Sequence, residues 1–321
     1  MKAFAIVALL AGLALTAALV AGTGAREVGA AVAAVGWGTA LIVAARAVGL
    51  ALAGAAWWFL FPPGRRPGLV TCVGLRFIRE GAGALLPVLQ IGGDLIGARI
   101  LVFQGMSGAL AVAGVISDLM VQAATQFLFT LIGLVALIAA GGDQAMVRFV
   151  AGGLALAAPA LVAFFVVQRR AGQRLVEPLL RRAAGGREWR GLSAVDDVYA
   201  SLRAIYDARG GVAASTVLQL AAWLFGATEV WIALTAMGHA VTAAQALVIE
   251  SLGHAVRGAA FAVPGAVGVQ EAGFIALCAL FGIPAQPALA LSLVKRVPDL
   301  VLGLPGVLAW QVMEGRRALR A

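Results

Sequence analysis

LLPVLQIGGDLIGAR at residues 85–99 and AVPGAVGVQEAG at residues 262–273 are the two stretches that decide the fold. Each belongs to a long apolar segment and interrupts it near the middle with proline, glycine and an acidic residue. Irregular backbone at membrane depth is tolerated only where protein or a water-filled cavity surrounds it. We therefore predict two re-entrant helical hairpins, at residues 71–106 and 244–283.

The composition of the whole chain favours a membrane protein. Hydrophobic residues make up 62% of the 321 residues and charged residues only 12%, whereas a soluble domain contains about 45–50% apolar residues. A helix needs ~20 apolar residues to cross the hydrocarbon core, which predicts an all-α polytopic membrane protein with about six full transmembrane helices besides the hairpins. The predicted spans are the apolar runs at 3–22, 36–61, 108–140, 147–167, 212–236 and 286–313.

The positive charges predict the orientation. Residues 168–210 hold nine arginines against five acidic residues, Arg65 and Arg66 occupy a short loop, and three more arginines lie at 316–320. Cytoplasmic loops of membrane proteins are enriched in Lys and Arg. We therefore expect these segments and both termini on the cytoplasmic side of a bacterial inner membrane, with Lys2 preceding an uncleaved first helix. The net charge of +9 is explained by this topology, and we expect no nucleic-acid partner.

The predicted order along the chain has four parts. An N-terminal transmembrane helix and loop (1–35) precede a first transmembrane repeat (36–167), a basic cytoplasmic connector (168–211) and a second repeat (212–321). The connector contains an amphipathic helix, with Ser193 as its N-cap and Gly210 at its end, which we expect on the membrane surface. Counting the crossings between basic segments makes the two hairpins enter from opposite faces.

The two hairpins align without gaps at an offset of 177 residues. This offset places Pro87 on Pro264 and Asp94 on Glu271, so proline and acid keep their seven-residue separation. Six identities fall between residues 81–113 and 258–290, where chance gives roughly three in so apolar a chain. Inverted repeats whose broken helices meet near the bilayer midplane are a transporter architecture.

Ionisable residues within the apolar segments form the candidate site. Each costs about 2.5–3.5 kcal/mol on insertion scales, so such residues usually face the bundle interior with a partner. Glu250, His254 and Arg257 share one helical face because they are spaced i, i+4 and i+7. We predict a path for a lipid head group lined by Arg79, Glu80, Asp94, Arg99, Glu250, His254, Arg257, Glu271, Lys295, Arg296 and Asp299, and a polar stripe formed by Asp118, Gln122 and Gln126.

The remaining charges in the spans are interpreted as structural. Arg46 and Glu229 are isolated in the sequence, and we expect each to form an ion pair that fixes helix packing. The cations of the hairpins outnumber what their acids need, so we expect some to be left for an anionic or hydroxylated head group.

Enzyme templates are missing from the sequence. It contains no nucleophile elbow, no zinc-binding HExxH and no phosphate-binding loop, and Cys72 and Cys278 lack metal-ligand spacing. We expect no catalytic residue, no metal and no cofactor. An enzyme that modifies a lipid head group is one rival, with His254 and Glu250 as its acid–base pair. A non-transporting assembly subunit is a second rival, in which the buried charges only pair.

Several stretches resemble the HpnL family of hopanoid-associated inner-membrane proteins, within a wider group similar to the flippase domain of lysylphosphatidylglycerol synthases. They are RFIREGAGALLPVLQIGGDLIGAR at 76–99, ISDLMVQAATQFLFTLIGL at 116–134, VPGAVGVQEAGF at 263–274 and ALALSLVKRVPDLVLGLPGVLAW at 288–310. The resemblance covers about residues 1–315.

This resemblance implies the movement of a membrane lipid, in this branch a hopanoid on its way to the outer membrane. Glu271 and Arg296 match an acid and a cation that recur in the wider group, and Asp94 and Arg99 match the first element. The wider group commonly has a double glycine after the proline, and Ala266 departs from that pattern. Another lipid, such as an anionic or aminoacylated phospholipid or a polyprenyl carrier, stays an alternative, and the sequence leaves a homo-oligomer open.

Overall fold

The computed structural model describes residues 25–85, 91–142, 144–169, 172–174, 190–260, 263 and 266–318. These residues form helices joined by short connections, and no strand occurs among them. The prediction of an all-α polytopic membrane protein is confirmed. The helices are α2 (Ala25–Val35), α3 (Gly38–Leu60), α4 (Leu69–Leu85), α5 (Ile91–Phe103), α6 (Gly108–Ala139), α7 (Gln144–Val167), α9 (Arg190–Asp207), α10 (Arg209–Ala236), α11 (Ala243–Ala259), α12 (Val269–Ala279) and α13 (Ala285–Ala318).

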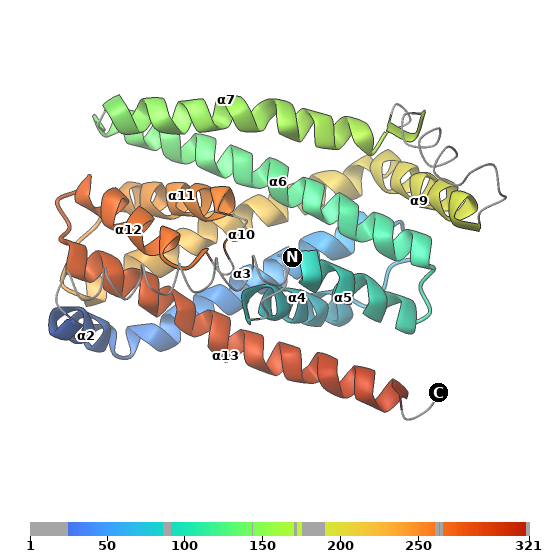
Figure 1. Cartoon of the computed structure of the whole chain (residues 1–321), viewed down its shortest axis with the longest axis horizontal. Helices are drawn as coiled ribbons and strands as arrows, with labels where there is room; N and C mark the ends of the chain where they lie inside the picture. The colour runs from blue at the N-terminus through green and yellow to red at the C-terminus, as the bar shows by residue number, and fades with distance from the viewer. Residues whose placement is uncertain are drawn as a thin grey trace.

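Four helices in the described part of the chain are long and apolar enough to cross a membrane, namely α3, α6, α7 and α10. Helix α13 is also long, at 34 residues, but carries Lys295, Arg296 and Asp299 in its middle. The predicted span at 3–22 lies outside the described residues. The long helices run roughly along the longest axis of the molecule (Figure 1).

Each predicted hairpin is a pair of short helices, α4 with α5 and α11 with α12. Pro87 and Pro264, which we expected to cause the breaks, both lie outside the described residues. Local capping fixes the start of α11, because the Thr242 hydroxyl accepts a hydrogen bond from the Gln245 N–H while the Gln245 side chain accepts from the Thr242 N–H.

The helix bounds follow the 177-residue offset. Helix α6 begins at Gly108 and α13 at Ala285, 177 residues later, and α5 and α12 begin at Ile91 and Val269. The hairpin α11–α12 lies toward the end of the bundle that holds α2, whereas α4 and α5 lie toward the end that holds α9 and the C-terminus (Figure 1). The two hairpins therefore lie toward opposite ends of the bundle (Figure 1).

The amphipathic helix of the connector differs from the prediction at both ends. Helix α9 begins at Arg190, before Ser193, and ends at Asp207, while Gly210 and Gly211 stand inside the first turn of α10. Gly211 serves close packing, because a Cβ there would lie 2.5 Å from the carbonyl oxygen of Phe59 in α3. Glycine here allows two helices to approach and does not end one.

The apolar face of α9 is covered by protein. Tyr199, Leu202, Ile205 and Tyr206 are buried in a hydrophobic cluster with residues of α3, α4, α5 and α6. The Tyr199 hydroxyl also donates a hydrogen bond to the carbonyl oxygen of Val167 at 3.0 Å. Helix α9 is thus docked on the bundle through its apolar face.

Candidate functional site

A cavity of about 380 Å³ lies where the two repeats meet. Its wall is formed by α3, α4, α5 and α6 from the first repeat and by α10, α11 and α13 from the second. Binding sites for small ligands usually measure about 300–1,000 Å³. Nine of the residues predicted from the sequence line it, namely Arg79, Glu80, Asp94, Gln122, Gln126, Glu250, His254, Arg257 and Asp299.

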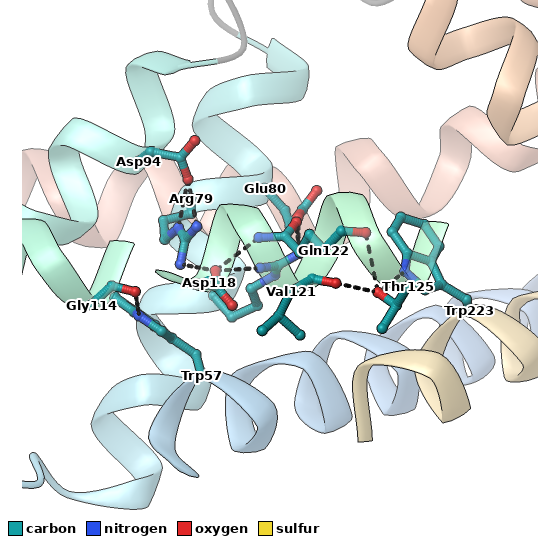
Figure 2. A network of polar contacts seen from close by, with 11 residues as sticks. Trp57, Arg79, Glu80, Asp94, Gly114, Asp118, Val121, Gln122, Thr125 and Trp223 are labelled. Carbon is teal, nitrogen blue, oxygen red and sulfur yellow. Dashed lines mark hydrogen bonds and ion pairs between the residues drawn. The ribbon is translucent and has the colours of Figure 1, made fainter. Parts of the chain in front are cut away.

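The first hairpin contributes a cluster of charges centred on Asp118 of α6. Arg76 and Arg79, one turn apart on α4, both reach the buried Asp118 carboxylate, at 3.2 and 2.7 Å. Figure 2 shows Arg79 lying between Asp118 and Asp94 of α5, whose Oδ1 it contacts at 2.5 Å. Arg76 also pairs with Glu80 at 2.8 Å. We call these five residues the Asp118 cluster.

Close packing holds Arg79 in this position. A Cβ on Gly93 would lie 2.2 Å from the Arg79 carbonyl oxygen, so α4 and α5 touch through backbone. The guanidinium group stacks 4.5 Å from the centre of the Trp57 ring, and the indole N–H of Trp57 donates to the Gly114 carbonyl oxygen at 3.1 Å (Figure 2). Glycines at the start of α5 therefore allow the ion pair between Arg79 and Asp94.

The second repeat builds a cluster centred on Lys295 of α13. The buried ammonium group donates to Glu229 of α10 and to Glu250 of α11, both at 2.9 Å. Arg46 of α3 contacts the same Glu229 oxygen, Oε2, at 3.1 Å, and His254 Nε2 lies 3.1 Å from Glu250 Oε1. We call these five residues the Lys295 cluster.

The side chain of His254 is held at the cavity wall by contacts from α6 and α10. Gln126 Nε2 donates to the His254 carbonyl oxygen at 3.2 Å. The imidazole ring packs edge-on against Trp223, with ring centres 4.8 Å apart, and Trp223 Nε1 donates to the Thr125 hydroxyl oxygen at 3.0 Å (Figure 2). Helix α6, which follows the first hairpin, therefore contacts both α11 of the second hairpin and α10.

Glu271, the counterpart of Asp94, is placed differently. It is fully buried, and its carboxylate accepts hydrogen bonds from the Gly268 N–H at 2.6 Å, from the Ser292 hydroxyl at 3.1 Å and from Arg296 at 2.7 Å. An acid in the first turn that accepts backbone N–H groups stabilises a helix start. Glu271 and Arg296 thus fasten α12 to α13 and do not line the cavity.

Two further predicted residues lie away from the cavity wall. The side chain of Arg99 is 61% exposed and pairs with Glu314 at 2.6 Å, while Lys295 lies behind the wall as the centre of its cluster. Arg257 and Asp299 line the wall and lie 3.9 Å apart. Of these four predicted residues, Arg257 and Asp299 therefore line the cavity, whereas Arg99 and Lys295 do not.

Five residues that were not predicted as site residues also line the cavity, namely Arg46, Arg76, Gln219, Trp223 and Glu229. Arg46 and Glu229 were treated as isolated, yet they pair with each other across 183 positions of sequence and join the Lys295 cluster. Treating every intramembrane ionisable residue as a site residue by default would have found both of them. Trp223 carried no such signal.

The charges of the wall nearly cancel. Arg46, Arg76, Arg79 and Arg257 supply four positive charges, and Glu80, Asp94, Glu229, Glu250 and Asp299 supply five negative ones. Each of the four arginines lies within 4 Å of a carboxylate. We expected some cations to be left for an anionic or hydroxylated head group. In the described wall each arginine instead forms an ion pair with a carboxylate.

The described residues of the wall offer hydrogen bonds and carboxylates but no hydroxyl, thiol or amine side chain. No Ser, Thr, Cys, Tyr or Lys occurs among the lining residues that the structure describes. Within the same described ranges, no group of three His, Cys, Asp or Glu side chains is arranged to hold a metal ion. His254 and Glu250 form a hydrogen-bonded pair at this wall, with His254 Nε2 3.1 Å from Glu250 Oε1.

Comparison with known proteins gives the family. The family model of the lysylphosphatidylglycerol synthase TM region matches residues 3–306. The chain belongs to this family. Membership indicates a membrane protein with a lipid-related function, in agreement with the apolar helices. No curated protein and no solved structure matches the chain.

Proposed function

We propose that this protein moves a lipid between the two leaflets of the membrane, with the polar head group crossing through the central cavity while the tail stays in the bilayer. The observation that carries this proposal is one polar cavity lined by both hairpins of an inverted repeat. Transporters bind their substrates near the midplane, at the interface of such repeats. The family supports a lipid as the substrate.

The balance of charge on the wall favours a head group without net negative charge. Four arginines face five acids, and each arginine already has a carboxylate partner. A hydroxylated head group needs hydrogen-bonding groups instead, and Gln122, Gln126 and His254 supply both donors and acceptors. Together with the resemblance to hopanoid-associated proteins, this leads us to propose a hydroxylated hopanoid as the lipid, exported towards the outer membrane.

Reconstitution tests this proposal directly. Purified protein in phosphatidylcholine vesicles should move a fluorescent hydroxylated hopanoid between leaflets, as measured by dithionite quenching of the outer leaflet. Fluorescent phosphatidylglycerol, an anionic lipid, should move at least ~10-fold more slowly. Faster movement of phosphatidylglycerol would overturn the assignment of the head group, and equal movement in protein-free vesicles would overturn transport itself.

A matched pair of variants on α5 tests the path. Asp94 lines the cavity and Arg99 lies outside it, although both belong to ion pairs. Asp94→Asn should slow movement at least ~10-fold, the effect of about 1.4 kcal/mol, whereas Arg99→Gln should stay within ~2-fold of wild type. Equal loss in both variants would remove Asp94 from the path.

An enzyme that modifies the head group is the rival function, favoured only by the His254–Glu250 pair. We propose that the lipid emerges chemically unchanged. Mass spectrometry of the vesicle lipids after transport checks this, and a covalently altered lipid made by wild type and lost in His254→Asn would establish the enzyme.

We also propose an inner-membrane location with residues 168–210 and the C-terminus in the cytoplasm. Helix α9 and the C-terminus lie at one end of the bundle, and the turn between α12 and α13 at the other (Figure 1). Single cysteines introduced in place of Gly282 and of Ser201, after replacement of the buried Cys72 and Cys278, should label from opposite sides in intact cells. Labelling from one side would reject this topology.

A further inference from the structure

His254 is one end of a chain of ion pairs whose other end, Arg46, also lines the cavity. Its side chain is 15% exposed and lines the cavity, whereas Glu250, Lys295 and Glu229 behind it are nearly inaccessible. The chain runs from His254 to Glu250 at 3.1 Å and from Glu250 to Lys295 at 2.9 Å. It continues to Glu229 at 2.9 Å and ends at Arg46 at 3.1 Å.

The contact with Glu250 fixes the role of each ring nitrogen. Glu250 Oε1 also accepts a hydrogen bond from Lys295, and an ionised carboxylate can only accept. His254 Nε2, 3.1 Å from the same oxygen, must therefore carry hydrogen. In neutral His254 the lone pair is on Nδ1, and this atom is the one that can take a further proton.

Protonation of His254 would change the net charge of this chain of ion pairs. Arg46 and Lys295 balance Glu229 and Glu250, so the chain is neutral while His254 is neutral. A proton on Nδ1 adds one positive charge at the cavity wall, stabilised by Glu250. The charged groups that face this position are Arg46 of α3, Glu80 of α4, Glu229 of α10, Glu250 and Arg257 of α11, and Lys295 and Asp299 of α13; α6 contributes the uncharged Gln126 and Phe129.

We propose that a proton and a lipid hydroxyl group compete for Nδ1 of His254, so that the protein exchanges protons for lipid. A hydroxyl that enters the cavity donates its hydrogen bond to the Nδ1 lone pair, and the same lone pair must release its proton to water first. Binding of one therefore expels the other, and no bond other than N–H forms or breaks. This inference rests on the proposed lipid transport and adds a proton-moving activity to it.

Exchange fixes the direction of coupling. Protons move from the acidic to the alkaline compartment, so lipid moves to the leaflet that faces the acidic compartment. One proton per lipid allows up to ~10-fold accumulation per pH unit, because one unit of pH corresponds to a tenfold change in an equilibrium constant. Vesicles at pH 7.5 inside and 6.5 outside should therefore collect fluorescent hopanoid in the outer leaflet.

The test uses wild-type proteoliposomes with and without the pH gradient, with a pH dye inside to record proton entry. The expected result is lipid accumulation in the outer leaflet together with proton entry that depends on the hopanoid. Movement of hopanoid that ignores the gradient and carries no protons would overturn the coupling and leave the transport proposal standing. If no hopanoid moves at all, both proposals fail.

The chain offers a matched control, because it contains only two histidines. His254→Gln should abolish the ratio between rates with and without the gradient, whatever its basal rate, whereas His239→Gln, outside the cavity wall, should keep that ratio. A gradient response retained in His254→Gln would overturn the proposal.

A measurement on wild-type protein guards against misfolding of the variant. With ¹⁵N-labelled histidine, only two imidazoles contribute to the NMR spectrum, and His239→Gln assigns them. Competition predicts that added hopanoid shifts the titration midpoint of His254 to lower pH and leaves that of His239 in place. An unchanged midpoint at saturating hopanoid would overturn the competition.

Discussion

The Asp118 cluster and the Lys295 cluster occupy equivalent places in the two repeats with opposite charges. Asp118 and Lys295 are separated by the repeat offset of 177 residues, and each is a buried charge on the long helix that follows a hairpin. Asp118 pairs with two arginines of α4, whereas Lys295 pairs with one glutamate of α10 and one of α11. At this position each repeat has a buried charge, and its sign is opposite to that of the side chains that contact it.

The difference shows what the repeat conserves. At the same offset Glu80 corresponds to Arg257 and Asp118 to Lys295, so the signs exchange while each of these charges keeps a partner of opposite sign. An unpaired charge is costly in a membrane interior. A buried charge of either sign avoids this cost when it has a partner of opposite sign. His254 belongs to the second half alone, since the first half has Phe77 at the corresponding position. The two halves are therefore alike in fold and unlike in chemistry.

Removing the central charge of either cluster should have the largest effect. Asp118→Asn removes the carboxylate that Arg76 and Arg79 share, and Lys295→Met leaves Glu229 and Glu250 without their shared cation. Loss of one partner from a buried pair lowers the free energy of unfolding by about 3–5 kcal/mol. Thermal denaturation in detergent should show this loss for both.

Lys295→Arg is the control for that experiment, because it keeps the charge and should lose less stability than Lys295→Met. The double variant Asp118→Asn/Lys295→Met tests whether the clusters are independent, since losses at separate sites add. A double loss well below the sum would mean that the two clusters act as one network.

Asp94 and Glu271 should separate by type of effect, although they are equivalent in sequence. Glu271→Gln weakens the buried contacts with Arg296 and Gly268 and should lower the free energy of unfolding by about 1–3 kcal/mol. Asp94→Asn should mainly slow lipid movement, because Asp94 lines the cavity. Thermal denaturation and lipid movement should be measured on both variants. If each variant lost stability and transport to the same extent, the two acids would have the same role.

The hairpins should differ in their tolerance of a methyl group. Gly93→Ala meets the Arg79 carbonyl oxygen at 2.2 Å, whereas Gly273→Ala meets the Val256 side chain at 2.9 Å. Overpacking costs about 1–3 kcal/mol, and Gly93→Ala should lie at the upper end because backbone cannot rotate away. Gly74→Ala in α4, with open space around it, should instead stabilise by about 1 kcal/mol. A larger loss for Gly273→Ala than for Gly93→Ala in thermal denaturation would contradict this ranking.

The smallest expected effect concerns Ala266, between α11 and α12. Its φ of 49° lies in the left-handed region, which costs a residue with a Cβ about 1–2 kcal/mol. Glycine relieves that strain and loses about 0.5–1 kcal/mol through the freedom of the unfolded chain. Ala266→Gly should therefore be neutral or stabilising by up to ~1 kcal/mol in thermal denaturation. A clear destabilisation would show that the buried Ala266 methyl group contributes more through packing than it costs in strain.

The sequence by itself predicted the membrane class, the two broken hairpins and their repeat. Apolar length decides whether a helix spans a membrane, and that quantity is local. Proline, glycine and acid within an apolar run are equally local signals. The family match over residues 3–306 agrees with the membrane class.

Only the tertiary structure decided which charges face the cavity and which fasten helices. Asp94 and Glu271 align in sequence, yet one lines the wall and the other caps α12 behind it. Arg46 and Glu229 looked isolated because their partners lie far away along the chain. A charge within a span indicates that an oppositely charged partner is needed. The identity of that partner depends on how distant helices pack, and it cannot be predicted from the neighbouring residues in the sequence.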